Sequence, residues 1–423
     1  MRNLSIYIEI DGEQRLVGFI TGESYAEATF KYDREYMDSA YGAPISISLP
    51  FQEESFTAES TKSFFESLLP EGFSRRAVAD WIKTDEKDYL SILSGLGREC
   101  LGAIKITEGD GKSTAHYEKL TKSQVRSLAA EGATRSTQIL METHLSLTGA
   151  SGKVGLYYDP KGRWYLPKGD APSTHIVKQS HIRLNRIVLN EQLCIMTAGN
   201  IGVDVPESFI VNVGEGKDSD VLYATKRYDR DLNGKKEIDG LLAPLRLHQE
   251  DFAQAMGISS EDKYEKQPLG YMRRMFELIT MHSSNPIEDK RKLLERMIFN
   301  FLIGNTDCHL KNYALLYSPD LKSVRLSPAY DIVSTRVYNS IPEMSFYIGG
   351  ELDFNAINRS SFIASADDIG LGKRAIENTF DSLADRFEKS ITEAAENLTQ
   401  SGFAAAKELK NDILKSGGYA QIK

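Results

Sequence analysis

A polar stretch near residue 305 lies in a hydrophobic setting and offers side chains that can do chemistry. It reads Asn305-Thr306-Asp307-Cys308-His309-Leu310-Lys311-Asn312. An aspartate followed five residues later by an asparagine is the catalytic-loop pattern of phosphoryl transfer, in which the aspartate accepts the proton of the attacking hydroxyl and the asparagine holds magnesium. Asp307 and Asn312 fit this spacing. The pattern therefore indicates transfer from a nucleotide, although Asn, Asp and Gly are also ordinary turn formers.

A second carboxylate, Asp331, follows just past a predicted hairpin. Residues 313–317 are typical of a short apolar strand, 318–320 of a turn and 324–326 of the returning strand. Because a hairpin returns the chain beside its starting point, Asp331 is placed to complete a metal site with Asn312. These hard oxygen ligands suit Mg²⁺, and no zinc-spaced histidine or cysteine set occurs. Asp331 could also simply end a loop.

Helices must position this loop. Residues 287–303 show a helical apolar pattern that predicts a buried helix ending at Gly304. Similar patterns cover about 249–256, 270–281 and, most clearly, 373–399. The stripe in the last segment consists of Ile376, Phe380, Leu383, Phe387, Ile391 and Leu398. The chain after residue 240 is therefore expected to be mainly helical.

The part before residue 230 offers a place for nucleotide phosphates. Residues 144–158 predict a strand, a turn of small residues and a second strand, and the strand 175–178 ends in Lys178. Glycines between paired strands let backbone amides approach phosphates, and a lysine on the next strand adds a fixed positive charge. The turn is not a Walker A motif, because Val154 follows Lys153. Taken alone, it could be a plain hairpin.

Two further elements would complete such a site. A helix over 190–198 carries Glu191, a candidate to hold the strand lysine, although an exposed helical glutamate is the plainer interpretation. Strands over 209–213 and 221–224 lead into residues 226–230, which we interpret as the hinge between a sheet-rich part and a helical part. Adenine usually binds through backbone groups at such a crossover.

Length and composition limit the protein class. The 423 residues are too many for one ordinary core and indicate two or three packed units. A net charge of −9 argues against a broad nucleic-acid-binding face. Three widely separated cysteines fit free thiols in a reducing compartment. No signal peptide and no apolar run long enough for a bilayer is present, so we expect a cytoplasmic protein without membrane contact.

Taken together, these segments resemble the HipA toxin family, the serine/threonine kinases of bacterial toxin–antitoxin modules. The resemblance covers nearly the whole chain. It rests on short motifs in a fixed order, namely residues 44–50, 64–70, 97–103, 146–153, 167–178, 227–230, 304–312 and 328–331.

The resemblance implies an α+β, two-lobed protein-kinase-like fold with an additional N-terminal domain, divided at about 1–107, 108–230 and 231–423. It implies ATP and Mg²⁺ as cofactors, Asp307 as catalytic base, and Asn312 and Asp331 as metal ligands. Lys178 would bind phosphate, Lys226 and Tyr228 would contact adenine through their backbone, and His309 and Lys311 would complete the catalytic loop. The phosphate loop would consist of Thr148, Gly149, Ala150, Ser151, Gly152 and Lys153.

The resemblance also implies regulation and partners. A serine just before the phosphate loop, here Ser146, is autophosphorylated in the family, which ejects that loop. The implied partners are a HipB-like DNA-binding antitoxin, which places the pair on its operator, and a protein substrate in translation, typically an aminoacyl-tRNA synthetase such as the glutamyl enzyme. Some positions depart from pattern: Lys226 stands where the family often has an acidic residue, and Tyr330-Asp331-Ile332 lacks the glycine of D-F-G.

Two other interpretations stay open at this point. A catalytically silent protein of this fold could hold an antitoxin and act as a corepressor. A kinase for small molecules could use the same catalytic pattern, since that pattern reports the donor and the base rather than the acceptor. The complete set of Asp307, Asn312, Asp331 and Lys178 favours an active kinase.

Overall fold

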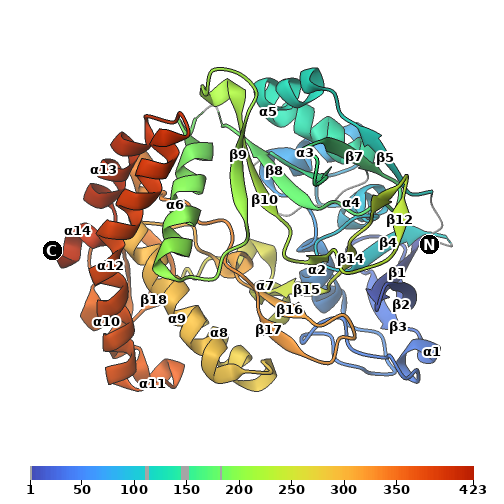
Figure 1. Cartoon of the computed structure of the whole chain (residues 1–423). Helices are drawn as coiled ribbons and strands as arrows, with labels where there is room; N and C mark the ends of the chain where they lie inside the picture. Colours follow the sequence, from blue (N-terminus) through green and yellow to red (C-terminus); the bar gives the residue numbers. More distant parts are fainter. Residues whose placement is uncertain (1, 110–113, 144–151, 182) are drawn as a thin grey trace. The chain divides into compact units, whose positions relative to one another are not determined.

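The computed structural model describes residues 2–109, 114–143, 152–181 and 183–423 (Figure 1). The chain forms two compact units, each built from segments that are separated in the sequence. The first comprises Met1–His181, Val211–Ser260 and Leu316–Val324, and the second Ile182–Ile210, Glu261–Leu315 and Arg325–Lys423. The division expected at residues 107 and 230 stays a prediction.

The first unit opens with a four-stranded antiparallel sheet of order β3-β2-β1-β4. Its strands are β1 (Arg2–Ile10), β2 (Glu13–Gly22), β3 (Thr29–Tyr32) and β4 (Ile104–Glu108). Leu4, Ile6 and Ile8 alternate along β1 and are almost fully buried. Asp11 and Gly12 have φ angles of 50° and 83°, as a tight hairpin turn requires. Four helices accompany this sheet: α1 (Arg34–Met37), α2 (Ala58–Glu66), α3 (Gly72–Ile82) and α4 (Tyr89–Leu96).

A six-stranded sheet of order β5-β7-β6-β8-β10-β9 follows. Its strands are β5 (His116–Lys119), β6 (Lys153–Tyr158), β7 (Trp164–Lys168), β8 (His175–Gln179), β10 (Val221–Lys226) and β9 (Ser208–Asn212), within which the chain re-enters the first unit. Helix α5 (Lys122–Thr143) packs on β6, β7 and β8 (Figure 1). The sequence patterns do not predict α5, because serines and threonines interrupt its apolar period.

Shorter elements complete the first unit. They are the pairs β11 (Arg230–Asp231) with β14 (Leu245–Arg246) and β12 (Glu237–Ile238) with β13 (Leu241–Leu242), then β15 (Gln249–Asp251), α7 (Phe252–Ala255) and the 3₁₀ turn η1 (Asp218–Asp220). The 3₁₀ turn η2 (Ser260–Asp262) crosses into the second unit. Helix α7 begins with a capping box in which Asp251 and Gln254 satisfy each other's backbone N–H groups.

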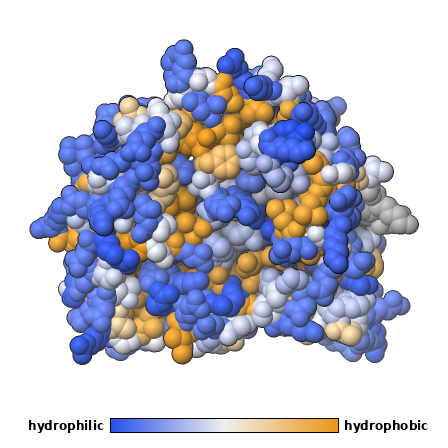
Figure 2. Space-filling model, in the orientation of Figure 1, coloured by the Kyte–Doolittle hydropathy of each residue, from blue (hydrophilic) through white to orange (hydrophobic). Residues whose placement is uncertain are grey.

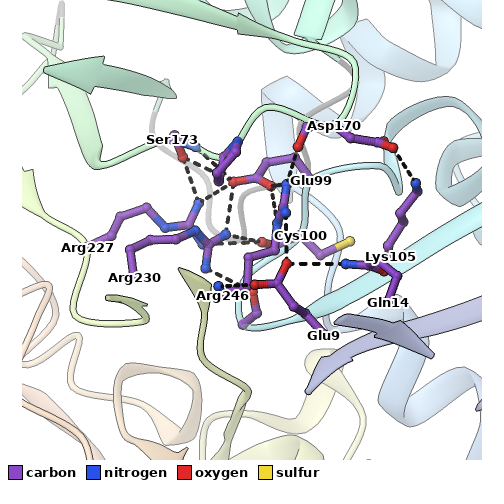
Figure 3. Close-up of polar contacts among 12 residues, drawn as sticks. Glu9, Gln14, Glu99, Cys100, Lys105, Asp170, Ser173, Arg227, Arg230 and Arg246 are labelled. Atoms are coloured by element: carbon purple, nitrogen blue, oxygen red, sulfur yellow. Dashed lines mark hydrogen bonds and ion pairs between the residues drawn. The ribbon is translucent and has the colours of Figure 1, made fainter. Parts of the chain in front are cut away.

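A buried cluster of charged side chains joins these elements within the first unit (Figure 3). Glu99 accepts hydrogen bonds from Arg230 at 2.9 Å and from Arg246 at 2.7 Å. Arg227 binds Asp229 through two nitrogens, at 2.8 and 2.7 Å. Burial by itself raises the pKa of Glu99, but the cations of Arg246, Arg230 and Arg227 outweigh it and hold that pKa well below its usual value. The cluster is therefore ionised.

The second unit is mainly helical. The helix expected over 249–256 is only partly present, because residues 249–251 form β15 and the helix α7 covers Phe252–Ala255. The helices of the second unit are α6 (Ile187–Ile201), α8 (Tyr271–His282), α9 (Pro286–Ile303), α10 (Arg359–Ala364), α11 (Ala366–Ile369), α12 (Lys373–Gln400), α13 (Ala406–Ser416) and α14 (Tyr419–Ile422). Helix α12 packs along α6, α9 and α13 (Figure 1). All six apolar residues of the stripe predicted for 373–399 are buried. That prediction is confirmed.

Short strands and turns make up the rest of residues 310–353, in which β16 and β17 cross the boundaries between the two units. They are β16 (Ala314–Tyr317), β17 (Val324–Leu326), β18 (Glu343–Ile348), β19 (Glu351–Asp353) and the 3₁₀ turns η3 (Leu310–Asn312) and η4 (Arg336–Tyr338). The predicted strands at 313–317 and 324–326 are confirmed as β16 and β17.

Other expectations concern thiols and membranes. Cys100, Cys194 and Cys308 are buried free thiols. Among the residues that the structure describes, no helix combines the length and apolar character needed to cross a bilayer. Figure 2 shows hydrophilic residues spread over the face in view, with hydrophobic residues between them, as is usual for a folded chain.

Candidate active site

The catalytic loop starts where helix α9 is forced to end. Asn285 caps the first turn, Pro286 occupies the next position, and Gly304 closes the helix with a φ of 70°. The carbonyl of Gly304 then accepts hydrogen bonds from the backbone N–H groups of Thr335 and Arg336, both at 3.0 Å. The loop is thus fixed to the chain that follows Asp331.

Asp307 and Asn312 are joined as the sequence pattern predicts. The side-chain amide of Asn312 donates from Nδ2 to the backbone carbonyl of Asp307 at 2.7 Å. Since Nδ2 is used in this way, the Oδ1 atom of Asn312 is left as an acceptor that can ligate a cation. Asn305 accepts from the N–H of Asp307 at 3.1 Å, and the side chain of Asp307 is exposed. The carboxylate of Asp307 therefore lies at the surface on a loop whose backbone is fixed.

Asp331 returns to the same loop. The hydroxyl of Tyr330, the preceding residue, donates to the carbonyl of Lys311 at 2.9 Å, next to Asn312. Asp331 has a φ of 51°, in the left-handed region that few non-glycine residues adopt. Strain of this kind gathers at functional sites. The oxygens of Asn312 and Asp331 are hard donors on adjoining segments and fit Mg²⁺.

Three other loop side chains are buried. His309 is 8% exposed and its ring meets the ring of Tyr264 edge-on, with centroids 5.0 Å apart. Lys311 is buried as well. Burial raises the pKa of the Cys308 thiol to about 12, so this cysteine stays protonated and fills space rather than acting as a nucleophile.

The predicted phosphate half lies in the first unit. Lys153 on β6 lies directly opposite Lys178 on β8, and Tyr223 on β10 lies opposite Lys178 on the other side. Directly opposed residues of antiparallel strands project from the same face, so both lysines share one face with Tyr223. The ammonium of Lys178 is 5.5 Å from the centre of the Tyr223 ring. Two adjacent cations suit a polyphosphate.

Part of the predicted loop falls outside the described residues. Ser146, Thr148, Gly149, Ala150 and Ser151 all lie there, whereas Gly152 and Lys153 are described.

Side chains of the predicted hinge, residues 226–230, make contacts that support the fold. The N–H of Arg227 donates to the carbonyl of Thr174 at 2.9 Å, and its side chain belongs to the buried charge cluster. Lys226 ends β10 opposite His175, and the hydroxyl of Tyr228 binds Gln249. The side chains of Arg227 and Tyr228 are thus used within the protein, and adenine contact through the backbone of Lys226 and Tyr228 stays a prediction.

The burial of Glu191 contradicts the plainer interpretation of the sequence. This residue is 4% exposed on helix α6, so the view of an exposed helical glutamate is wrong. A buried carboxylate needs a partner, and the pairing of Glu191 with Lys178 stays a prediction.

Some residues at the site escaped the sequence patterns. Tyr264 donates its hydroxyl to Asp307 across 43 positions of sequence. Away from the site, Glu99 and Arg246 of the buried charge cluster pair across 147 positions of sequence. A tyrosine followed by Glu265 carries no motif, so only the tertiary fold reveals these pairs.

A unit with paired lysines on a sheet and a unit with an Asp307–Asn312 loop define a kinase of the α+β class. Two family models match the chain: the HipA N-terminal domain over residues 8–107 and the HipA-like C-terminal domain over residues 145–391. The chain belongs to the HipA family. It is a HipA-like serine/threonine-protein kinase toxin, and such kinases use ATP. The family resemblance and fold class expected from the sequence are confirmed.

Individual relatives agree with this assignment. The chain is 30% identical over 400 residues to Y4mE of Sinorhizobium fredii, covering 90% of this chain and 91% of that protein. It is 27% identical over 408 residues to the serine/threonine-protein kinase toxin HipA of Shewanella oneidensis, covering 90% and 88%.

A solved structure shares the fold. The HipA, HipB and operator DNA complex of the Shewanella oneidensis toxin–antitoxin system matches with a TM-score of 0.77 and 22% identity, covering 99% of this chain and 97% of that chain.

Proposed function

We propose that the chain is an ATP- and Mg²⁺-dependent protein kinase whose catalytic base is Asp307. Asn312 and Asp331 hold Mg²⁺, and Lys178 holds phosphate together with residues 148–153. The observation that best supports this assignment is the hydrogen bond from Asn312 Nδ2 to the carbonyl of Asp307. It fixes the base and the amide ligand relative to each other and leaves an oxygen of Asn312 for the cation.

The residues divide the reaction between them. Asp307 accepts the proton of a serine or threonine hydroxyl as that oxygen bonds to the γ-phosphorus, and the bond from phosphorus to the ADP oxygen breaks. Lys153 and Lys178 offset charge on the phosphates. When bound, Mg²⁺ neutralises charge that develops on the β- and γ-oxygens. Lys226 and Tyr228 bind adenine through backbone groups, and His309 and Lys311 support the loop.

The proposal extends to partners and substrate. The Shewanella oneidensis relative was solved with HipB and operator DNA, which supports a HipB-like antitoxin here and DNA contact mainly through that antitoxin. We assign the acceptor to a protein of translation, with an aminoacyl-tRNA synthetase such as the glutamyl enzyme as the first candidate. Its phosphorylation would arrest growth.

Autophosphorylation at Ser146 would switch the kinase off. A phosphate carries about −1.5 to −2 charges near neutral pH. At residue 146 this charge would lie two residues before the phosphate loop that begins at Thr148, where it would repel ATP.

The test is phosphate transfer by the full chain. We would incubate the protein and the Asp307→Asn variant with ATP and Mg²⁺, with and without a bacterial lysate, and measure intact and peptide masses. Asp385→Asn, which changes an exposed aspartate of α12, is the matched control. Loss of the base should lower the rate about 10²- to 10⁴-fold, while the control keeps the full rate.

The outcomes separate the competing interpretations. Phosphate on Ser146 and on a lysate protein, dependent on Asp307 and on Mg²⁺, supports the proposal and names the target. ATP binding without any Asp307-dependent transfer would refute catalysis and favour the silent corepressor. Transfer to a metabolite alone would favour a small-molecule kinase.

A further inference from the structure

Tyr264 holds one oxygen of the proposed catalytic base. Its hydroxyl donates to Oδ1 of Asp307, and both residues belong to the second unit. We propose that Tyr264 is a positioning residue that orients the carboxylate of Asp307 toward the acceptor hydroxyl. This inference rests on the proposed function, because it assumes that Asp307 is the base.

The backbone around Tyr264 is fixed on both sides. The carbonyl of Lys263 accepts from the N–H of Leu310, within the catalytic loop, at 3.3 Å. The N–H of Glu265 donates to the carbonyl of Ser345 on β18 at 2.8 Å. Tyr264 is therefore attached through its neighbours to the loop that it serves.

The side chain of Glu265 strengthens this attachment. Glu265 is only 2% exposed, and its carboxylate accepts from the N–H groups of Tyr271 and Tyr347, both at 3.0 Å. The first bond joins it to the start of α8 and the second to β18. A buried carboxylate that satisfies two backbone donors is a rigid support. Residue 264 thus projects from a fixed position.

The ring of Tyr264 is restrained in its direction. It meets His309 edge-on at 5.0 Å between centroids, and the ammonium of Lys263 lies 5.5 Å from its centre. Contacts of both kinds favour one ring orientation. Tyr264 is 38% exposed and Asp307 is exposed as well, so their contact lies at the surface, where an acceptor must arrive.

The chemical reason for such a residue is the exposure of Asp307. An exposed carboxylate can rotate among several orientations in water, and each wrong orientation removes the base from reach of the acceptor proton. Oδ1 of Asp307 accepts from Tyr264, and the backbone of Asp307 is bound to Asn305 and Asn312, so the carboxylate is held in one orientation.

The test removes the hydroxyl and keeps the ring. We would measure steady-state kinetics of Tyr264→Phe with the unphosphorylated form of the acceptor that the wild type phosphorylates, and ATP affinity separately. The matched control is Tyr419→Phe, which deletes a tyrosine hydroxyl that binds the carboxylate of Glu388 at 3.1 Å in the same unit. We expect kcat to fall about tenfold in Tyr264→Phe with the KM and Kd for ATP unchanged, as loss of one hydrogen bond to a charged group implies.

Each result decides one point. Unchanged kcat in Tyr264→Phe, or a higher kcat because the hydroxyl competes with the acceptor, would overturn the proposal. A changed Kd for ATP or a failure to fold would assign Tyr264 to loop structure instead and overturn it as well. If wild-type protein shows no Asp307-dependent transfer, it is the proposed function that fails. An active, Asp307-dependent wild type with a normal Tyr264→Phe rejects only the role of Tyr264.

Discussion

Glu99 and Arg246 form a buried ion pair in which Nε and Nη2 of the arginine bind one carboxylate oxygen at 2.9 and 2.7 Å. The surrounding cluster contains four acids and four bases, so the opposite charges balance within the first unit (Figure 3). They are Glu9, Glu99, Asp170, Asp229, Lys105, Arg227, Arg230 and Arg246. The sheet of β1 and the chain around β14 are held together by charge rather than by apolar contact alone.

Removal of the Glu99 charge should therefore destabilise the protein strongly. Glu99→Gln leaves three buried arginines with too few anions, and breaking a buried pair from one side costs about 3–5 kcal/mol. Urea unfolding measures this change. Glu237→Gln, at an exposed position of β12, is the control and should stay within about 0.5 kcal/mol of wild type. Equal stability of both variants would show that the cluster contributes little.

Glu250 makes stability depend on pH. Burial raises its pKa to about 7, although Ser46 at 2.5 Å, Tyr317 and the N–H of Ile47 at 3.1 Å donate to it. Between the ordinary pKa of about 4.5 and this raised value, the folded state keeps a proton that the unfolded chain has lost. The stabilisation that Glu250 contributes is therefore complete below about pH 4.5 and falls as pH rises toward 7. Glu250→Gln has no such loss, so from pH 5 to 7.5 it should gain about 2 kcal/mol of unfolding free energy relative to wild type.

The neighbouring His248 acts in the opposite direction. Burial lowers its pKa to about 4, so stability from this residue rises between about pH 4 and 6.5. The two effects nearly cancel in wild type, which is why the comparison must use the difference between variant and wild type at each pH. Glu53→Gln, an exposed site, should show no such pH-dependent difference, and a flat difference for Glu250→Gln as well would contradict the prediction.

Gly304 is the glycine on which the catalytic loop depends. Its φ is 70°, and an added Cβ would lie 2.9 Å from Cγ of Arg336 and 3.1 Å from Cα of Gly417. Gly304→Ala should lower the unfolding free energy by about 2 kcal/mol, from the left-handed backbone and the close contacts, and reduce kcat as the loop shifts. Thermal unfolding and kinase assays measure both.

A second glycine provides the control for this change. Gly372 has an ordinary φ of −65° and nothing within 4 Å of an added Cβ. Gly372→Ala should cost less than about 1 kcal/mol, because Gly372 is the N-cap of α12 and alanine is only a poorer cap there. If Gly304→Ala had an equally small effect, the loop would not need the left-handed position.

The paired lysines should control nucleotide affinity. Lys178→Met removes one of two cations on the same sheet face, so the Kd for ATP should rise about tenfold while the affinity for adenosine stays constant, because adenosine lacks phosphates. Isothermal titration with both ligands measures this contrast. Lys161→Met, in the exposed turn between β6 and β7, is the control. An equal loss of adenosine affinity would place Lys178 at the base or in the fold instead.

The local features of this protein can be predicted from its sequence. The stripe of α12, the end of α9 at Gly304 and the hairpin that leads to Asp331 all follow from periodicity and turn chemistry. The Asp307–Asn312 pair was visible because its two members lie in one short loop. The roles assigned to these site residues stay predictions.

Features that depend on distant segments were not predictable. Arg227 and Arg230 appeared only as hinge residues, because their partner Glu99 lies more than 100 positions away. Glu191 has the sequence surroundings of an ordinary surface glutamate, and only the folded structure shows that residues 188–195 of α6 are all buried. Tyr264 carries no motif at all. In each case the environment is created by packing and is absent from any local window of sequence.

The interrupted course of the chain through its two units has a consequence for synthesis on the ribosome. The first unit contains the late segment Leu316–Val324. The carbonyl of Pro319 accepts from the N–H of Asp11 at 3.1 Å, and the N–H of Tyr317 donates to the carbonyl of His248 at 2.9 Å. A nascent chain therefore cannot complete this unit until residue 324 has left the exit tunnel, after the catalytic loop has already been made. A chain that stops between residues 307 and 316 therefore carries Asp307 but lacks the Leu316–Val324 segment of the first unit.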